Sequence, residues 1–155
     1  TVSPTAQAPA IGNGCESAPT NACGDGGGAA ANLNGQGEAH DFSGYGFGIP
    51  AGARIDGIAV RLDWWLDSRV GANSMAVQLS PDGGVTWTSA LVDSREATRE
   101  ATTALGGPTE TWGRSWQASE LSPTSFRVRI TMNSDRSTRD FFLDWVPVTV
   151  FYTGT

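Results

Sequence analysis

The sequence predicts an all-β protein, an antiparallel β-sandwich of jelly-roll type with about eight strands. Three observations predict this class. The 155 residues include 20 glycines and short Val, Ile and Leu runs separated by turn residues, and no window has a sustained apolar period of 3.6 residues. This length suits one domain with a substantial core. We therefore expect a single sandwich domain over residues 15–155 and almost no helix.

The first part of the chain predicts irregular structure. Residues 1–14, "TVSPTAQAPAIGNG", are rich in Pro, Ala, Thr and Gly, a composition typical of an extended arm or linker. Residues 15–44 continue glycine-rich, and we expect a long loop there. Such a loop in a compact domain is often functional or held by an ion. His40, the single histidine, is expected to be exposed in this loop.

The clearest strand lies in "IDGIAVRLDWWLDS", residues 55–68. Apolar residues at alternate positions from Ile58 to Leu66 predict a face that packs on the core. The opposite face carries Ala59, Arg61, Asp63, Trp65 and Asp67. The alternation therefore places Trp65 on the outside of the sheet, among charged side chains.

Later segments predict further strands. Residues 73–80 alternate between apolar and polar, and residues 93–107 favour an irregular strand. Residues 126–134 alternate sharply, with inward positions at Phe126, Val128, Ile130 and Met132. The last segment, 140–153, is apolar on both faces, as expected of a strand covered on both sides. Pro147 within it must lie at a bulge or a free edge.

The stretch "SPDGGVTWTS", residues 80–89, matches the pattern S-x-D-x-G-x-T-W, which resembles the Asp-box of sialidases and related β-propellers. A propeller needs several blades of roughly 40–50 residues each and does not fit this length. Turn chemistry explains each residue type, because glycines adopt positive φ values and short polar side chains bond within a turn. We interpret the stretch as a structural hairpin formed by Ser80, Asp82, Gly84, Thr86 and Trp87.

Two cysteines, Cys15 and Cys23, are separated by seven residues in a segment rich in Gly, Asn and Pro. This spacing favours a disulfide that closes a small loop, worth roughly 2–3 kcal/mol. A metal site is the alternative, with His40 as the one histidine available. The disulfide predicts an extracellular or cell-surface location.

The first residue, Thr1 rather than Met, is typical of an excised domain or of a mature form without its signal peptide.

Composition excludes several classes of function. The formal net charge is −6, and all ten basic residues are arginine. An acidic chain without a basic patch is unsuited to nucleic acid, because phosphate contacts dominate that affinity. The sequence has no apolar stretch of the roughly 18 residues that a membrane span needs. It also has no GxSxG or metalloprotease motif, and no spacing singles out a pair of acids, so we expect no enzyme.

A wider resemblance covers roughly residues 18–153. It rests on the segments "PTNACGDGGG", "YGFGIPAGARIDGIAVRL", "LSPDGGVTW", "LGGPTETWGRSW", "FRVRI" and "RDFFLDWVPVTVFY". Together they resemble modules that recur in secreted, multidomain bacterial surface proteins. The resemblance implies a non-catalytic extracellular β-sandwich and names no ligand.

The segment "FFLDWV" resembles the last strand of jelly-roll carbohydrate-binding modules, in which an aspartate helps to hold a structural Ca²⁺. The resemblance implies that Asp144 is a calcium ligand, and Asp25 in the glycine-rich loop is the expected partner. Calcium takes six to eight oxygen ligands, some of which loop carbonyls can supply. The alternative is a salt bridge from Asp144 to an arginine such as Arg139, because an unpaired buried carboxylate is costly.

Two functions fit these features. The sequence favours a structural or adhesive subunit of a surface filament or layer, in which the arm 1–14 binds a like subunit by strand addition. Docking of the arm on its own domain is the other possibility. The alternative function is a carbohydrate-binding module, because sugar rings stack on exposed aromatic faces. Its candidate residues are Trp65, Trp112 and Trp116, whereas we expect Trp64, Trp87 and Trp145 to lie in the core or under long loops.

Overall fold

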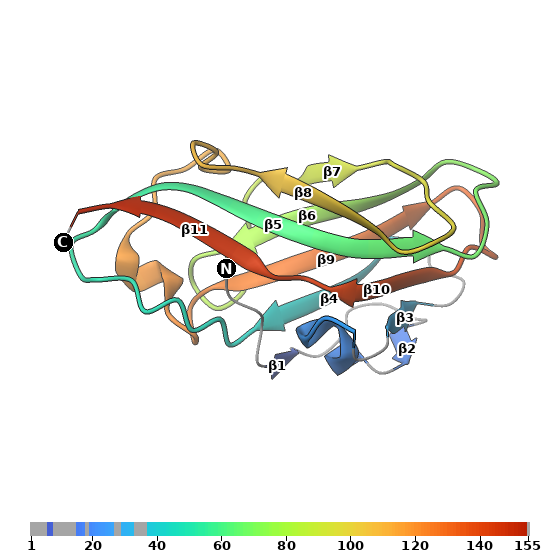
Figure 1. The fold of residues 1–155 in the computed structure, drawn as a ribbon, viewed down its shortest axis with the longest axis horizontal. Helices are drawn as coiled ribbons and strands as arrows, with labels where there is room; N and C mark the ends of the chain where they lie inside the picture. Colours follow the sequence, from blue (N-terminus) through green and yellow to red (C-terminus); the bar gives the residue numbers. More distant parts are fainter. Residues whose placement is uncertain (1–5, 8–14, 18, 27–28, 33–36, 155) are drawn as a thin grey trace.

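The computed structural model describes residues 6–7, 15–17, 19–26, 29–32 and 37–154. Two antiparallel sheets face each other (Figure 1), which confirms the predicted all-β sandwich. The chain passes repeatedly from one sheet to the other, as in a jelly roll. Eight strands, β4 to β11, lie in the described chain after residue 37, in agreement with the predicted number.

The sheet around β9, called the β9 sheet, has the strand order β1 (Ala6–Gln7), β4 (Glu38–Ser43), β9 (Arg127–Ser134), β6 (Asn73–Ser80) and β7 (Leu91–Asp93). The second sheet, the β5 sheet, is built on β5 (Arg54–Leu66). One side of β5 pairs with β8 (Ala101–Gly106). The other side pairs with β11 (Val148–Thr153) and β10 (Phe141–Trp145) in turn, and the sheet continues from β10 to β3 (Ala30–Asn32) and β2 (Cys15–Ser17).

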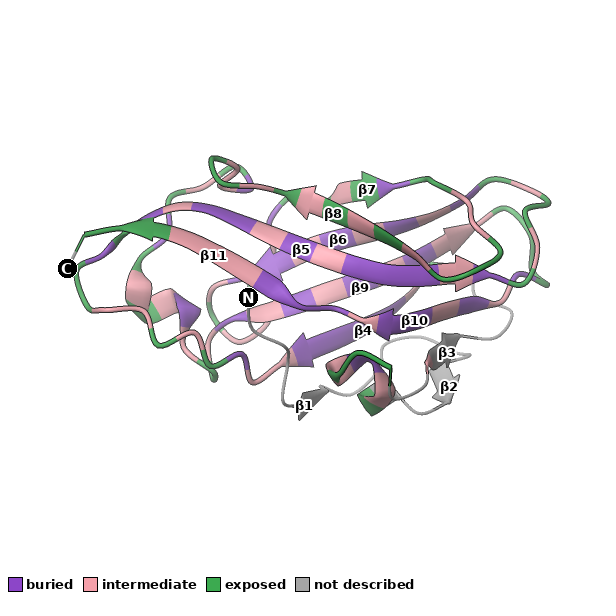
Figure 2. Cartoon of the chain, in the orientation of Figure 1, coloured by how far each residue is buried: buried purple, intermediate pink, exposed green. Residues whose placement is uncertain are grey.

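The core lies between the two sheets, and buried residues follow the strands of both (Figure 2). The predicted inward side chains of β5 are all buried: Ile58, Val60, Leu62, Trp64 and Leu66. They face the buried residues in and beside β9, which are Phe126, Val128, Ile130 and Met132. A fully buried aliphatic side chain stabilises the fold by about 1.5–3 kcal/mol relative to an exposed one. Both predicted alternations are therefore confirmed.

The described residues between 15 and 44 are more regular than predicted. They contain β2, the short 3-10 turn η1 (Pro19–Cys23), β3 and β4. β4 pairs with β9 and places His40 opposite Ile130. His40 is 1% exposed, so the prediction of an exposed loop histidine is wrong. A polar residue at an inward position hides the alternation by which a strand is recognised.

Helix is scarce, as predicted. The described residues contain η1 and one further 3-10 turn, η2 (Ala118–Leu121). Neither approaches the length and apolar character that a helix needs in order to cross a membrane, and no other helix is described.

Two residues of the predicted arm are described. Ala6 and Gln7 form β1, which pairs with β4 of the same chain at the edge of the β9 sheet. The other residues of the arm 1–14 lie outside the described part of the chain. Where the arm is described, it is therefore docked on its own domain.

Cys23 has a free, half-buried thiol, so the structure does not contain the predicted disulfide. Burial raises the pKa of this thiol, which keeps it in its less reactive protonated form. The side chain of Cys15 lies outside the described residues, and its pairing with Cys23 stays a prediction.

The hairpin between β6 and β7 has the contacts that turn chemistry predicts. The hydroxyl of Ser80 accepts a bond from the amide of Gly84 (2.8 Å) and donates to Asp82 (2.9 Å). The Asp82 carboxylate also accepts bonds from the amide (2.8 Å) and the hydroxyl (2.6 Å) of Thr86, and these bonds lower its pKa. The indole N–H of Trp87 donates to the carbonyl of Gly84 (3.1 Å), whose φ is +93°. These residues build a turn.

The apolar segment 140–153 forms two strands that lie end to end beside β5. A short break that contains Pro147 separates β10 from β11, where a residue without a backbone N–H is tolerated. The Pro147 carbonyl accepts a bond from the amide of Arg61 (3.0 Å). A register shift within β10 places a bulge at Asp144. Bulges re-aim side chains, and this one lies where the candidate site forms.

Candidate functional site

An aromatic pair stands on the outer face of the β5 sheet. Trp65 of β5 and Phe142 of β10 are cross-strand partners, and their rings stack with centroids 5.4 Å apart and planes 18° from parallel. Trp64 points into the core and Trp65 points out, because successive residues of a strand face opposite sides. Both rings of the pair are half-buried, so part of each is open to solvent. The outward position predicted for Trp65 agrees with this placement.

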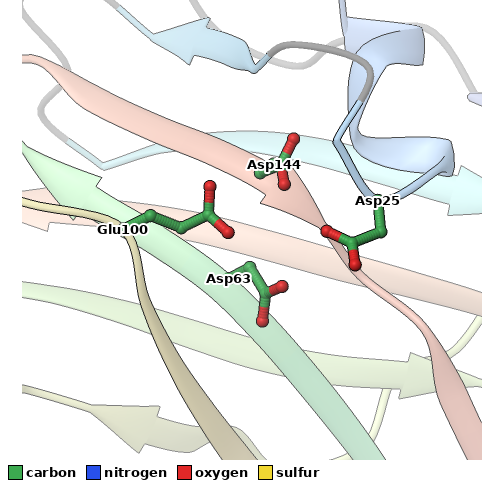
Figure 3. A group of neighbouring side chains, drawn as sticks. All are labelled: Asp25, Asp63, Glu100 and Asp144. Carbon is green, nitrogen blue, oxygen red and sulfur yellow. The ribbon is translucent and has the colours of Figure 1, made fainter.

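Four carboxylates meet on the same face, beside the aromatic pair. Asp63 of β5 and Asp144 of β10 each lie two positions from the aromatic residue of their own strand. Asp25, from the segment after η1, and Glu100, from the segment before β8, complete this acidic cluster (Figure 3). One carboxylate oxygen from each residue lies within 4.8 Å of the others. The acidic cluster therefore joins elements that are far apart in the sequence.

The sequence predicts half of the acidic cluster. Asp25 and Asp144 are the expected calcium ligands, and the structure brings their carboxylates together. Asp63 is missed although the alternation of β5 places it on the outer face with Trp65, a signal that was available. Glu100 gives no signal, because it belongs to a charged segment without periodicity.

The four carboxylates of the acidic cluster are neutralised by fewer positive charges than they carry negative ones. Asp63 and Asp144 are buried, at 1% and 3% exposure, whereas Asp25 and Glu100 are exposed. Asp63 pairs with Arg61 (2.8 Å) and is the one member with an ion pair in the described part of the chain. Burial, and then the negative charges of Asp144, Asp63 and Asp25, raise the pKa of Glu100. The carboxylates repel one another unless a proton or a cation neutralises them.

The geometry of the acidic cluster fits a calcium ion. Calcium takes oxygen ligands at about 2.3–2.6 Å, so two ligands across one ion lie at most about 5 Å apart. The oxygens of the cluster meet that limit, and all of them are hard carboxylate donors. The two acids of a glycosidase stand about 5–9.5 Å apart, on either side of a sugar bond. The residues present therefore suit a structural cation better than acid–base catalysis.

The alternative prediction for Asp144, a salt bridge with Arg139, is wrong. Arg139 is buried, and it binds the carboxylate of Asp67 (2.8 Å) and the carbonyl of Val70 (2.8 Å). These bonds hold its guanidinium beyond the end of β5. Asp144 instead accepts a bond from the amide of Gly26 (3.3 Å), which ties the segment after η1 to β10.

Trp145 is the partner of Asp63 across β10 and β5, but its ring is covered. The guanidinium of Arg61 lies over this ring, 4.8 Å from the centroid, and the same group binds Asp63. A cation above an aromatic ring occupies the π face that a sugar would need. Beside the acidic cluster, the open aromatic surface is therefore that of Trp65 and Phe142.

The prediction that Trp112 and Trp116 form a sugar platform is wrong. The two side chains are only 3% and 6% exposed. The indole N–H of Trp112 donates to the carbonyl of Ile58 (2.9 Å), and that of Trp116 donates to the carbonyl of Thr111 (2.8 Å). Arg114 also lies over the Trp116 ring, 4.5 Å from its centroid. The loop that holds both residues folds back on the core, so their faces are used within the protein.

The three remaining tryptophans differ in burial. Trp64 belongs to the core, as predicted, and is 2% exposed. Trp87 and Trp145 are half-buried and lie under arginines, with Arg129 4.0 Å above the centroid of the Trp87 ring. Cation–π contacts, rather than full burial, cover these two rings.

No protein-family model matches the sequence, and no curated protein matches it. Solved structures of similar fold include carbohydrate-binding modules. A family 16 carbohydrate-binding module is 11% identical with a TM-score of 0.47, and the match covers 83% of this chain and 80% of that one. The module TmCBM61, in complex with β-1,4-galactotriose, is 14% identical with a TM-score of 0.44, covering 87% and 77%.

A structure described as CBM4 is 12% identical with a TM-score of 0.47, and the match covers 79% of this chain and 83% of that one. At such identities the likeness concerns the fold alone. The resemblance of residues 80–89 to the Asp-box of sialidases is unsupported by these comparisons.

Proposed function

We propose that this protein is a non-catalytic carbohydrate-binding module that binds sugar rings on Trp65 and Phe142. The observation that carries the proposal is the half-open aromatic pair on the outer face of the β5 sheet. The C–H groups of a sugar ring pack on the negative face of an aromatic ring, and the indole of Trp65 is the larger platform. Aromatic side chains with partly open faces on a sheet are suited to a ligand.

Polar groups beside the aromatic pair support the proposal. Asp63 and Asp144 lie two residues along the strands from the aromatic pair, a distance of roughly 7 Å. Glu100 and Asp25 extend the acidic cluster to the solvent. The exposed carboxylates of Asp25 and Glu100 can accept charge-assisted hydrogen bonds from sugar hydroxyls. Aromatic platform and acidic cluster together supply both the apolar and the directional contacts of a sugar site.

The platform is also rigid. Trp65 lies on β5, which has partners on both sides, and Phe142 stacks against it. A binding surface that is already ordered loses little conformational entropy when a ligand binds. Polysaccharides outside the cell are the expected partners, and an extracellular location is part of the proposal.

Binding to polysaccharides tests this proposal. We expect the calcium-loaded protein to be retarded by at least one soluble polysaccharide in affinity electrophoresis. Trp65→Ala should weaken that binding about tenfold, because one lost aromatic contact is worth up to about 1.5 kcal/mol.

The matched control is Tyr152→Ala. Tyr152 is an exposed aromatic residue on the same sheet, but it lies beside the opposite end of β5. Equal weakening by both substitutions, or no retardation by any of a broad panel of plant, fungal and bacterial polysaccharides, would contradict the proposal.

We further propose that the acidic cluster binds one structural Ca²⁺. The cluster unites the segment after η1, β5, the segment before β8, and β10. A cation there would relieve the repulsion among the carboxylates and fasten the N-terminal part of the chain to the β5 sheet. Its chemistry is structural, and Arg61 would continue to neutralise Asp63 beside it.

Thermal unfolding with calcium and with EDTA tests the ion. At a calcium concentration 100 times the Kd the ion adds about 2.7 kcal/mol, so we expect the Tm to rise by about 5–10 °C. Asp144→Asn and Asp25→Asn should abolish that rise. Glu110→Gln, outside the cluster, should keep it. An identical Tm in calcium and EDTA would overturn the calcium proposal and leave the aromatic platform untouched.

Assembly into a filament through the N-terminal arm, the function that the sequence favours, has less support. The described part of the arm pairs with β4 of its own chain, and that pairing competes with donation to a neighbour. Like-subunit assembly stays a prediction. Light scattering of the protein with and without residues 1–14 tests it, because an arm that assembles subunits predicts oligomers for the full chain and monomers for the truncated one.

A further inference from the structure

A cavity of about 410 Å³ lies on another side of the molecule from the aromatic pair. It is found where β7, at the edge of the β9 sheet, runs beside β8, at the edge of the β5 sheet (Figure 1). The segment between these strands contributes to its wall. Its lining includes Trp64, Arg69, Asp93, Arg95, Glu96 and Thr103. Small-molecule sites span roughly 300–1,000 Å³, so the cavity is large enough for one sugar-sized ring.

The acidic groups of the cavity are already bound by the protein. One oxygen of Asp93 accepts a bond from the indole N–H of Trp64 (2.7 Å), and the other accepts one from the amide of Arg95 (3.0 Å). Glu96 accepts a bond from the side chain of Asn73 (2.5 Å). These bonds hold both carboxylates in place and order the floor of the cavity.

Among the residues that the structure describes, the arginines of the cavity form no ion pair. Six of the ten arginines form ion pairs in the described chain, and the other four are Arg69, Arg95, Arg99 and Arg127. Two of these four line this one cavity. Arg95 donates one bond to the carbonyl of Thr102 (2.8 Å), which leaves further N–H donors on the same guanidinium. In a chain of net charge −6, two unpaired guanidinium groups at one cavity favour an anionic ligand.

We propose that this cavity is a second binding site, for a ring molecule that carries one carboxylate, such as a hexuronic acid. Guanidinium groups bind planar carboxylates with paired hydrogen bonds. Asp93 and Glu96 repel excess negative charge, so a single carboxylate is preferred to a dianionic phosphate. Trp64 and small alanine side chains line the apolar part of the site. The site uses neither Trp65 nor the acidic cluster, and it does not depend on the function proposed above.

Titration with galacturonate and glucuronate, followed by NMR of the ¹⁵N-labelled protein, tests this inference. We expect saturable shifts at millimolar concentrations for amides of residues 93–97 and 101–103, and weaker binding as salt rises, because the contact is ionic. Arg69→Gln and Arg95→Gln together should weaken binding at least tenfold. Arg99→Gln removes a comparable unpaired arginine of the same segment that does not line the cavity, and it should change little.

Three results would overturn the inference. They are the absence of shifts at about 20 mM uronate, equal shifts with neutral glucose or with phosphate, and unchanged affinity in the double arginine variant. Trp65→Ala serves as a further control and should leave uronate binding intact. Loss of polysaccharide binding in that variant and loss of uronate binding in the arginine variant therefore report on separate sites.

Discussion

Two adjacent tryptophans on β5 have opposite roles. Trp64 is 2% exposed and donates its indole N–H to Asp93 (2.7 Å), whereas Trp65 stands half-open on the outer face. One step along a strand reverses the face of a side chain, and the alternation of β5 is long enough to reveal this in the sequence. Trp112 and Trp116 lie in a segment without a period, so no pattern could foretell that they fold onto the core.

The acidic cluster shows a similar limit at the scale of single residues. The resemblance of "FFLDWV" to a known type of strand singles out Asp144, and its partner Asp25 follows from the expected loop. Glu100 joins them only because β8 pairs with β5 in one particular register. Such a register depends on contacts between distant segments, which the local sequence does not specify.

Glu100 provides a test of the electrostatics. Burial, and then the neighbouring carboxylates, raise its pKa above the ordinary value of 4.5. A carboxyl whose pKa is higher in the folded state favours folding when protonated, and that contribution is lost as the pH rises through the raised pKa. In EDTA we therefore expect Glu100→Gln to raise the Tm at pH 7 and to have little effect below about pH 4.5.

The measurement is the Tm of the Glu100→Gln variant and of the natural protein from pH 3.5 to 7, with Glu110→Gln as the control for the loss of one charge. In calcium the sign should reverse, because Glu100→Gln removes a ligand. If the two curves of Tm against pH are parallel in EDTA, the neighbouring carboxylates do not destabilise the ionised form of Glu100.

At the scale of elements, periodic strands could be predicted and interrupted ones could not. β5 and β9 alternate cleanly, and their inward residues are buried as expected. β4 is missed because His40 occupies an inward position opposite Ile130. The last apolar run predicts one strand with a bulge or a free edge at Pro147. The structure has two strands there, β10 and β11, separated by the break that contains Pro147. That break is adjacent to the bulge at Asp144, so the interruption contributes to the site.

The hairpin between β6 and β7 carries a prediction of its own. Ser80 is fully buried, and its hydroxyl bonds both to the amide of Gly84 and to Asp82. We expect Ser80→Ala to lower the free energy of unfolding by about 1–2 kcal/mol, because the turn loses two hydrogen bonds and each is worth about 0.5–1.5 kcal/mol. Urea unfolding measures this, with the exposed Ser89→Ala as control. Polysaccharide binding should be unchanged in both, and its loss in Ser80→Ala would assign the hairpin a role beyond structure.

At the scale of the whole molecule, the sandwich separates three features. The aromatic pair and the acidic cluster lie on the outer face of the β5 sheet, the arginine-lined cavity opens beside β7 and β8, and the N-terminal β1 lies at the far edge of the β9 sheet. The fold class follows from composition and periodicity. The site follows only in part, because it combines residues from strands and loops that meet through the topology.

The most direct test of the central claim is to map a bound glycan on the protein. An oligosaccharide from the polysaccharide that retards the protein would be titrated into the calcium-loaded ¹⁵N-labelled protein. The account predicts shifts of the Trp65 indole N–H and of amides in residues 63–66 and 141–144, with little change on the β9 sheet. Shifts confined to the β9 sheet, with the Trp65 indole unmoved, would contradict it.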